Sequence, residues 1–426
     1  MKRVVILCVW LFSVVAGHAQ LSLAECRRLA RENYPEIRQY DLVHQTEQYN
    51  LSNAARAWIP QIAFSAQATW QTDAPNFPKE LTGMLAQQGL EIPGLRKDQY
   101  KVALELNQTI WDGGKSVADK RIARAEAAEQ KTMTDVDLYE LEGRVDDLYF
   151  GILLLDERIA QTNLTLNLLR SNLEKVRALQ RNGVAMQSDA DVLEAELLSV
   201  GQQLIQFESS CDSYRRMLGI FIGQKVGDRK LQRPSAVQPL SGESARPELA
   251  MFAAKIDRLT AQEKMVKSSS MPRLGFFAQG YYGYPGLDYM QSMMNSDWSW
   301  NAMLGVKLSW NFGAYYTQKN NLNKLRISRQ QVEVQRDVFL FNMNLQAAQE
   351  NGDIARLRKA IADDDRIVAL RRSVREAAES KLRNGIIDTH DLLSKITDES
   401  TASMARSMRE IELLKAIYEY KHTINR

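Results

Sequence analysis

The longest regular pattern of apolar positions in this chain lies between residues 115 and 180. Apolar side chains recur there at spacings of three and four residues, separated mainly by charged and polar ones. The recurring positions are Leu138, Leu141, Val145, Leu148, Ile152, Leu155, Ile159, Thr162, Leu166, Leu169, Leu173 and Val176. A seam sustained in this way is typical of a coiled coil, because it keeps one narrow face against a partner helix. The stretch contains no proline, and at about 1.5 Å of rise per residue it predicts a helix on the order of 100 Å long.

Before this helix the pattern changes to a strict alternation of apolar and polar residues, which is typical of β-strands. One alternating run follows Pro60, and a second ends just before Gly113 and Gly114. A stretch rich in proline and glycine separates the two runs and reads as a loop. We therefore predict a β-hairpin over residues 61–111, with the proline and the two glycines at its corners with the neighbouring helices.

An Arg-Asn-Gly sequence closes the long helix. Gly183 is a C-terminal signal, because glycine readily adopts the left-handed conformation that ends a helix. Ser188 and Asp189 are suited to cap the next helix, which we predict to return over residues 188–222. A polar linker that contains prolines follows over residues 223–245.

The same order of elements then appears a second time. The sequence around Pro60 matches the sequence around Pro272, and Arg383-Asn384-Gly385 repeats Arg181-Asn182-Gly183. Such self-similarity indicates an internal duplication. We divide the chain into a leader at 1–19, a first repeat at 20–222, the linker at 223–245 and a second repeat at 246–426. The second repeat is predicted to contain a helix, a hairpin over 273–310 with Gly313 at its corner, a long helix over 314–382 and a return helix over 389–420.

The first 19 residues have the pattern of a secretory signal peptide. Lys2 and Arg3 precede an apolar run, and Gly17-His18-Ala19 supplies a small-residue cleavage site. Removing the two basic residues leaves 53 bases against 52 acids, a balance that gives no support to nucleic-acid binding. No other run of 18 apolar residues occurs, so no transmembrane helix is predicted.

Two cysteines, Cys26 and Cys211, remain after the leader. Two cysteines in an exported chain of this length do not form a disulfide framework. They could pair with each other, and the interpretation we favour is two buried thiols on helices.

The alternating runs have the length of tilted membrane-spanning strands, about 9–11 residues, and tryptophans and tyrosines gather near their ends. A soluble sheet packed on a core is the alternative, but the hairpins lie between long polar helices that offer no core. In lipid, a four-stranded sheet would leave two unpaired edges. Two copies would supply eight strands, and a barrel of eight strands is barely wide enough for its own side chains. We therefore expect an oligomer, and we favour a homotrimer whose twelve strands close in lipid and leave a channel.

This order of helix, proline, strand, loop, strand, glycine corner, long helix, Arg-Asn-Gly tip and return helix, repeated twice, resembles the TolC-like outer-membrane efflux family. The resemblance covers the whole mature chain. It implies a mainly α fold class with a membrane β-barrel part, in which a trimer forms a 12-stranded barrel and an α-helical periplasmic tunnel in the Gram-negative outer membrane.

The function implied by the resemblance is an outer-membrane channel of a tripartite efflux or type I secretion system. Such a channel is a passive exit duct for substrates that an inner-membrane pump of RND, ABC or MFS type delivers through a periplasmic adaptor. Two alternatives stay open at this point: a structural periplasmic coiled coil, and an adaptor (membrane fusion) protein without a pore.

The resemblance also assigns roles to the two tips. Adaptor-docking turns would contain Gly183, Ser188, Gly385 and Thr389. A periplasmic tip gate would contain Asp391, Asp388, Asp189, Arg181 and Arg383. Asp391 matches a carboxylate that projects into the tunnel as a ring, and rings of this kind select cations. Ser394 stands where the family has a further aspartate. An ordinary helical hairpin uses the same residue types as caps, so a purely structural role stands beside the functional one.

Searches for catalytic chemistry find nothing in the sequence. There is no His-x-x-x-His, Cys-x-x-Cys, Walker loop or Gly-x-Ser-x-Gly motif, and His44, His390 and His422 are isolated. We therefore predict no enzyme activity, no cofactor and no metal site.

Overall fold

The computed structural model describes residues 20–90, 92–235, 244–384 and 386–425. The predicted signal peptide and Gly385 lie outside the described residues, as do residues 236–243 of the linker.

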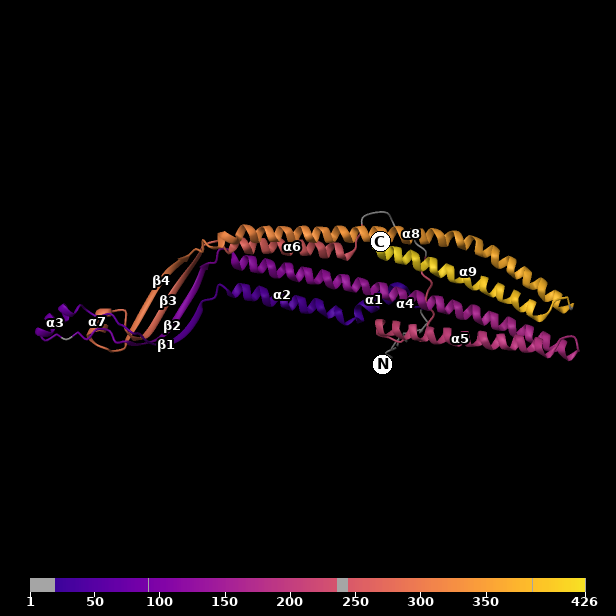
Figure 1. Ribbon diagram of the computed structural model, residues 1–426, viewed down its shortest axis with the longest axis horizontal. Helices are drawn as coiled ribbons and strands as arrows, with labels where there is room; N and C mark the ends of the chain where they lie inside the picture. The colour runs from indigo at the N-terminus through magenta and orange to yellow at the C-terminus, as the bar shows by residue number, and fades with distance from the viewer. Residues whose placement is uncertain (1–19, 91, 236–243, 385, 426) are drawn as a thin grey trace, which may run out of the picture. The chain divides into compact units, whose positions relative to one another are not determined.

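Long helices make up most of the described chain (Figure 1). In the first half they are α1 (Leu23–Asn33), the 3₁₀ helix η1 (Pro35–Arg38), α2 (Gln39–Arg56), α4 (Lys115–Arg181) and α5 (Gln187–Ile222). In the second half they are α6 (Pro247–Ser268), α8 (Ala314–Arg383) and α9 (Thr389–Ile424). Pro35 occupies the first position of η1, where its missing N–H costs nothing. The order of the main helices and strands in the first half therefore recurs in the second.

Three local features differ from the sequence-based expectations. A short helix, α3 (Lys79–Gln87), interrupts the stretch expected to be a loop, and α7 (Tyr289–Met294) does the same in the second hairpin. Helix α9 continues to Ile424 rather than ending at residue 420, because its last turn buries Thr423. Helix α5 begins one residue early, with Met186 rather than Ser188 at the capping position.

Four strands form one antiparallel sheet in the order β1 (Gln61–Trp70), β2 (Asp98–Trp111), β3 (Arg273–Tyr284) and β4 (Ser299–Ser309). The two hairpins join through β2 and β3, whose register runs from Tyr100 opposite Tyr284 to Thr109 opposite Gly275. Among the described residues, the outer edges of β1 and β4 have no partner strand.

The described chain separates into two compact units, and each draws segments from both halves of the sequence. The first contains residues up to 40, 132–250 and 336 onward, and the second contains 41–131 and 251–335, including the whole sheet. The compact units therefore do not coincide with the two sequence repeats.

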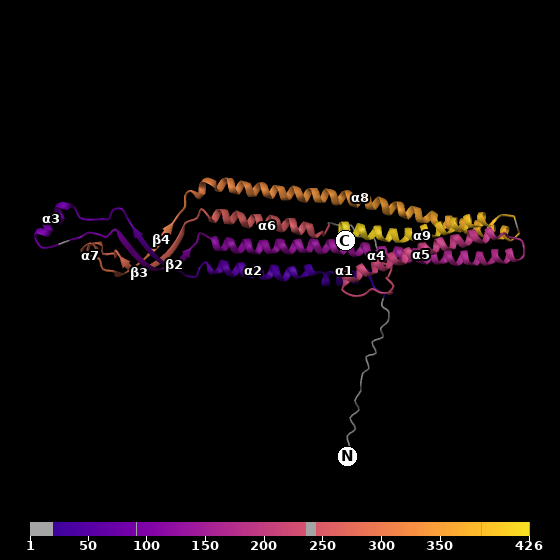
Figure 2. The same cartoon turned by 60° about the horizontal axis from the view of Figure 1, so that its bottom comes forward.

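The predicted seam of α4 is the core of the first unit. Ten of its twelve positions are less than 9% exposed, and Leu155 and Ile159 are half-buried. One part of the seam packs with α1, α5 and α9, and another packs with α5, α8 and α9 near the helix tips. Figure 2 shows α5 beside α4, and α9 beside α8. Burying one leucine or isoleucine contributes about 1.5–3 kcal/mol, so this seam is the main source of stability in the unit.

Polar contacts join the start of the chain to this core. Arg27 donates two hydrogen bonds to the buried carboxylate of Asp146, 119 residues away. The buried Tyr149 hydroxyl lies 2.8 Å from the carbonyl oxygen of Leu21 and 2.6 Å from that of Gln232. Cys26 and Cys211 are both buried free thiols, which confirms the interpretation favoured above. Burial raises the pKa of Cys26 to about 12, so this thiol stays protonated.

No helix in the described parts of the chain combines the length and the apolar character needed to cross a membrane.

Candidate functional site

The sheet has two chemically different faces. Cross-strand partners share a face, and in the register of this sheet the even-numbered residues oppose one another on all four strands up to a bulge near Trp111. The even-numbered face is almost wholly apolar: Ile62, Phe64, Ala66, Trp70, Val102, Leu104, Leu106, Ile110, Phe276, Ala278, Tyr282, Trp300, Leu304, Val306 and Leu308. The odd-numbered face carries mainly polar side chains, including Gln61, Ser65, Gln67, Lys101, Glu105, Asn107, Gln279, Asn301 and Lys307.

The apolar face is uncovered in the described chain. Phe64, Trp300 and Leu304 are 72%, 82% and 74% exposed. An uncovered apolar surface that spans four strands indicates an apolar environment or a partner on that side.

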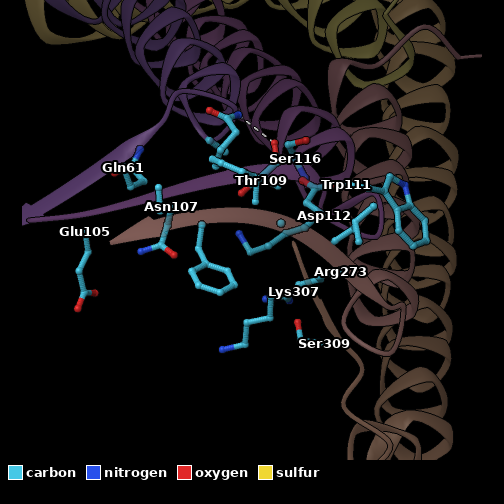
Figure 3. Close-up of a pocket in the computed structure, with 18 of the residues that line it drawn as sticks. Gln61, Glu105, Asn107, Thr109, Trp111, Asp112, Ser116, Arg273, Lys307 and Ser309 are labelled. Atoms are coloured by element: carbon cyan, nitrogen blue, oxygen red, sulfur yellow. Dashed lines mark hydrogen bonds between the residues drawn. The ribbon is translucent and has the colours of Figure 1, made fainter. Parts of the chain in front are cut away.

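The polar face is hollowed where the strands meet the helices. A hollow of about 570 Å³ lies there, and Figure 3 shows Glu105, Asn107, Arg273 and Lys307 among its lining side chains. Gln279 links two charges of this face, because it accepts a hydrogen bond from Lys101 at 3.1 Å and donates one to Glu105. The hollow is therefore lined by both charged and neutral polar groups.

The strand–helix corner after β2 is built by Asp112, Gly113 and Gly114. The Asp112 carboxylate accepts hydrogen bonds from the N–H groups of Gly114 at 2.9 Å and Ser116 at 2.6 Å, and so caps α4. Gly113 has φ +71°, and a β-carbon there would lie 2.7 Å from Cβ of Met271. Glycine is therefore required at position 113 both by backbone conformation and by space.

The other predicted corner residues have different surroundings. Pro60 lies between the last turn after α2 and the first residue of β1, and Pro272 directly precedes β3. Gly313 lies in the turn before α8 and is not among the glycines with positive φ, so this corner does not repeat the geometry of Gly113. A tryptophan stabilises a strand–helix corner in each hairpin. Trp58 Nε1 donates a hydrogen bond to Ser116 Oγ, and Trp310 Nε1 donates one to the Ser270 carbonyl, each at 3.0 Å.

The first helical tip joins α4 to α5. Gly183 has φ +74°, and the N–H of Val184 donates to the carbonyl of Leu179 at 2.9 Å, which closes α4 in the expected left-handed manner. The Asp189 carboxylate accepts a hydrogen bond from the N–H of Met186 at 2.8 Å. Ser188 is exposed within the first turn of α5 and does not cap it. The sequence-based prediction placed this cap two to three residues late, because methionine is not a capping residue type.

The second tip joins α8 to α9. The N–H of Ile386 donates to the carbonyl of Lys381 at 3.0 Å, the same spacing as in the first tip. Asp388 is the N-cap of α9, and its carboxylate accepts a hydrogen bond from the N–H of Asp391 at 2.7 Å. Thr389 is buried, whereas the Asp391 side chain is exposed and has no partner among the described residues. Asp388 thus has a structural role, and the carboxylate of Asp391 is left without one.

The predicted gate residues are only partly brought together. Within the described chain, Arg181 and Arg383 are exposed and form no ion pair, so neither closes on a tip carboxylate of its own chain. The ion pairs near the tips involve other residues: Lys175 contacts Glu379 at 3.3 Å, and Arg375 bonds both Glu379 and Glu399. Burial raises the pKa of Glu379, but the hydrogen bonds from Arg375 and Lys175 outweigh it and hold that pKa below its usual range.

Sequence reasoning did not single out the charged residues of the polar sheet face. Lys101, Glu105, Arg273 and Lys307 all lie on it. The alternation of apolar and polar residues was the available signal, because it already placed these odd-numbered positions on one face of the strands. Among the described residues there is no group of three His, Cys, Asp or Glu side chains that could hold a metal ion.

Comparison with known protein families gives one match. Residues 27–223 match the family model described as "Outer membrane efflux protein". A search of curated protein sequences found no relative of this chain.

Several solved structures share the fold over nearly the whole chain. The outer-membrane channel OprN has a TM-score of 0.69 at 14% identity, covering 94% of this chain and 89% of its own. The outer membrane protein VceC from Vibrio cholerae has a TM-score of 0.67 at 14% identity, covering 94% and 95%. The CmeC outer membrane channel of Campylobacter jejuni has a TM-score of 0.65 at 14% identity, covering 94% and 85%. At this level of identity the likenesses establish the fold.

Proposed function

We propose that this chain, a TolC-like member of the outer membrane efflux protein family in the Gram-negative outer membrane, is the exit duct of a tripartite efflux or type I secretion system. The duct is passive. Its substrates are delivered by an inner-membrane pump of RND, ABC or MFS type through a periplasmic adaptor, and the pump supplies the energy.

The observation that carries this proposal is the two-faced sheet with free edges. Its even-numbered face is apolar and suits lipid, and its odd-numbered face is polar and suits a water-filled lumen. A sheet in lipid must close on itself, because each unpaired N–H or C=O costs several kcal/mol there. Pairing β4 of one subunit with β1 of the next satisfies both edges, and three copies give twelve strands around a lumen.

The two alternative functions explain this sheet less well. A structural coiled coil or an adaptor without a pore has no use for an apolar face of four strands, which would be exposed to water at considerable cost. The proposed duct covers that face with lipid.

We assign the helical tips to adaptor docking and gating. Gly183, Ser188, Gly385 and Thr389 belong to the docking turns, and the apolar side chains of Val184, Met186 and Ile386 are 67%, 75% and 68% exposed beside them. Exposed apolar groups at a helix end suit a protein partner. Asp391, repeated three times in the trimer, would form a carboxylate ring that favours cations and binds divalent ions. Asp388 and Asp189 contribute negative charge nearby while they cap their helices.

The proposal is tested by reconstituting the purified protein in planar bilayers and recording current. We expect discrete conductance steps that divalent cations reduce. Replacing Asp391 with Ala should raise the conductance or weaken the divalent block, whereas Asp353→Ala, a matched exposed aspartate in the middle of α8, should change neither.

Absence of steps from folded, membrane-inserted protein would refute the duct. Steps that are identical in wild type and in the Asp391→Ala variant would leave the duct intact and remove Asp391 as its gate.

A further inference from the structure

The polar sheet face is not uniform along the strands. In the two rows nearest the helices, the charged side chains of the strands are all basic: Arg273 lies opposite Ser309, and Lys307 lies opposite Gly275, which in turn lies opposite Thr109. The only carboxylate of this face, Glu105, lies two rows further along the sheet, in the row of Gln279 and Met303. The row between them holds Phe277.

Arg273 and Lys307 are unpaired. They are diagonal neighbours on β3 and β4, a relation that places side chains on one face about 7–8 Å apart. Both are exposed, and neither has an ion-pair or hydrogen-bond partner in the described parts of the chain. Two like charges held side by side repel each other, and an anion bound between them removes that repulsion.

The carboxylates around the hollow are already engaged. Asp112 accepts two backbone N–H groups at the start of α4, and Asp119 is paired with Lys115 at 2.8 Å. Glu105 accepts a hydrogen bond from Gln279, which also accepts one from Lys101. The formal charges that line the hollow balance, but the negative ones have partners and the basic pair on the strands does not.

An aromatic ring lies beside Lys307, the nearer of the two bases: Phe277 is its diagonal neighbour, whereas Arg273 lies two rows away on the same strand as Phe277. Phe277 on β3 pairs with Gly305 on β4, and a β-carbon at Gly305 would lie 2.9 Å from Cε1 of the ring. The ring therefore lies across the strand at a place where only glycine leaves room for it. Figure 3 shows Arg273, Lys307 and Ser309 at the same end of the hollow.

We propose that Arg273, Lys307 and Phe277 form a binding site for organic anions, of the aromatic carboxylate class, on the inner wall of the duct. The two bases bind the carboxylates, the hydroxyls of Thr109 and Ser309 are hydrogen-bond donors in the same rows, and Phe277 offers a face to an aromatic ring. This inference rests on the proposed function, because in the closed duct the three copies bring six bases to one level of the lumen. Rings of arginine and lysine favour anions in pores.

The test is equilibrium dialysis of the purified full-length protein against benzene-1,3,5-tricarboxylate. We expect saturable binding that weakens as salt rises. The double variant Arg273→Gln/Lys307→Gln should bind at least about tenfold more weakly, the loss expected when charge-assisted bonds are removed. Lys79→Gln, which removes an exposed base in α3 outside the hollow, should bind as wild type does.

Two further variants separate the contribution of charge from that of the aromatic ring, and folding is checked for each. Arg273→Lys/Lys307→Arg keeps both charges and should bind within a few-fold of wild type. Phe277→Leu should weaken the benzene tricarboxylate but leave cyclohexane-1,3,5-tricarboxylate unchanged. Because Arg273 and Lys307 are exposed and unpaired, the variants at these two positions should retain the wild-type helix signal and melting curve. Both signals are measured on the same preparations, and on Phe277→Leu as well.

Equal dissociation constants for wild type and the double glutamine variant would overturn the inference. Conductance recorded on the same preparations keeps this failure distinct from failure of the duct. Normal conductance steps, together with equal anion binding by wild type and the double glutamine variant, would refute the binding site alone. Absence of conductance steps in wild type would refute the duct.

Discussion

Acidification should weaken the first compact unit through one half-buried histidine, His422. Its imidazole stacks on Tyr139 with ring centroids 4.2 Å apart and an interplanar angle of 6°, and its Nε2 faces the α4 backbone at Gly143. Arg246 lies close, with its guanidinium 4.8 Å from the Tyr139 ring centroid and a 3.2 Å hydrogen bond to the His422 carbonyl. Burial, followed by the positive charges of Arg246 and Arg27, lowers the pKa of His422 to about 4.

The sign of the effect follows from proton binding. An unfolded histidine has a pKa of about 6.5, so between pH 6.5 and 4 the unfolded chain binds more protons than the folded chain. Stability is therefore lost as pH falls through this window. Between pH 7.5 and 5 the full shift corresponds to about 2 kcal/mol, and partial exposure of the ring reduces this to roughly 1–2 kcal/mol.

The variant His422→Phe isolates this contribution. Phenylalanine keeps the stacking on Tyr139, and the ring nitrogens it removes have no hydrogen-bond partner among the described residues. The apparent urea midpoint of the helix signal should fall more for wild type than for the variant between pH 7.5 and 5. The comparison is needed because burial raises the pKa of Asp146, a shift that acts in the opposite direction. Equal falls in wild type and variant would refute the reasoning.

Two further substitutions test packing, each with a matched control. Leu169→Ala removes a seam residue that is 1% exposed, and urea titration should show the helical unit destabilised by about 3–5 kcal/mol. Leu164→Ala, at a position that is 62% exposed, should have little effect. Similar losses of stability in the two variants would mean that the seam is not the core. Gly113→Ala adds a β-carbon 2.7 Å from Cβ of Met271 and should lower the melting temperature more than Gly114→Ala does. Gly114 also has a positive φ, but the space around it is open. Equal shifts in melting temperature would show that the contact with Met271 has no effect.

Much of the architecture follows from periodicity alone. Spacings of three and four gave the buried seam of α4, and strict alternation gave both faces of the sheet. These patterns are legible because each strand or helix must bury or expose one continuous surface.

The features that the sequence did not reveal depend on contacts between distant segments. The pairing of Arg27 with Asp146, and the neighbouring positions of Arg273 and Lys307, follow from tertiary packing and strand register rather than from local pattern. The cap of α5 was misplaced because Asp189 serves the N–H of Met186, a residue type with no capping preference.

The central claim is that three copies of this chain close one barrel around a lumen, and electron microscopy of the detergent-purified protein tests it most directly. We expect class averages with threefold symmetry and a single closed ring of density at the level of the strands. Single subunits with an open four-stranded sheet, or a symmetry other than threefold, would contradict it.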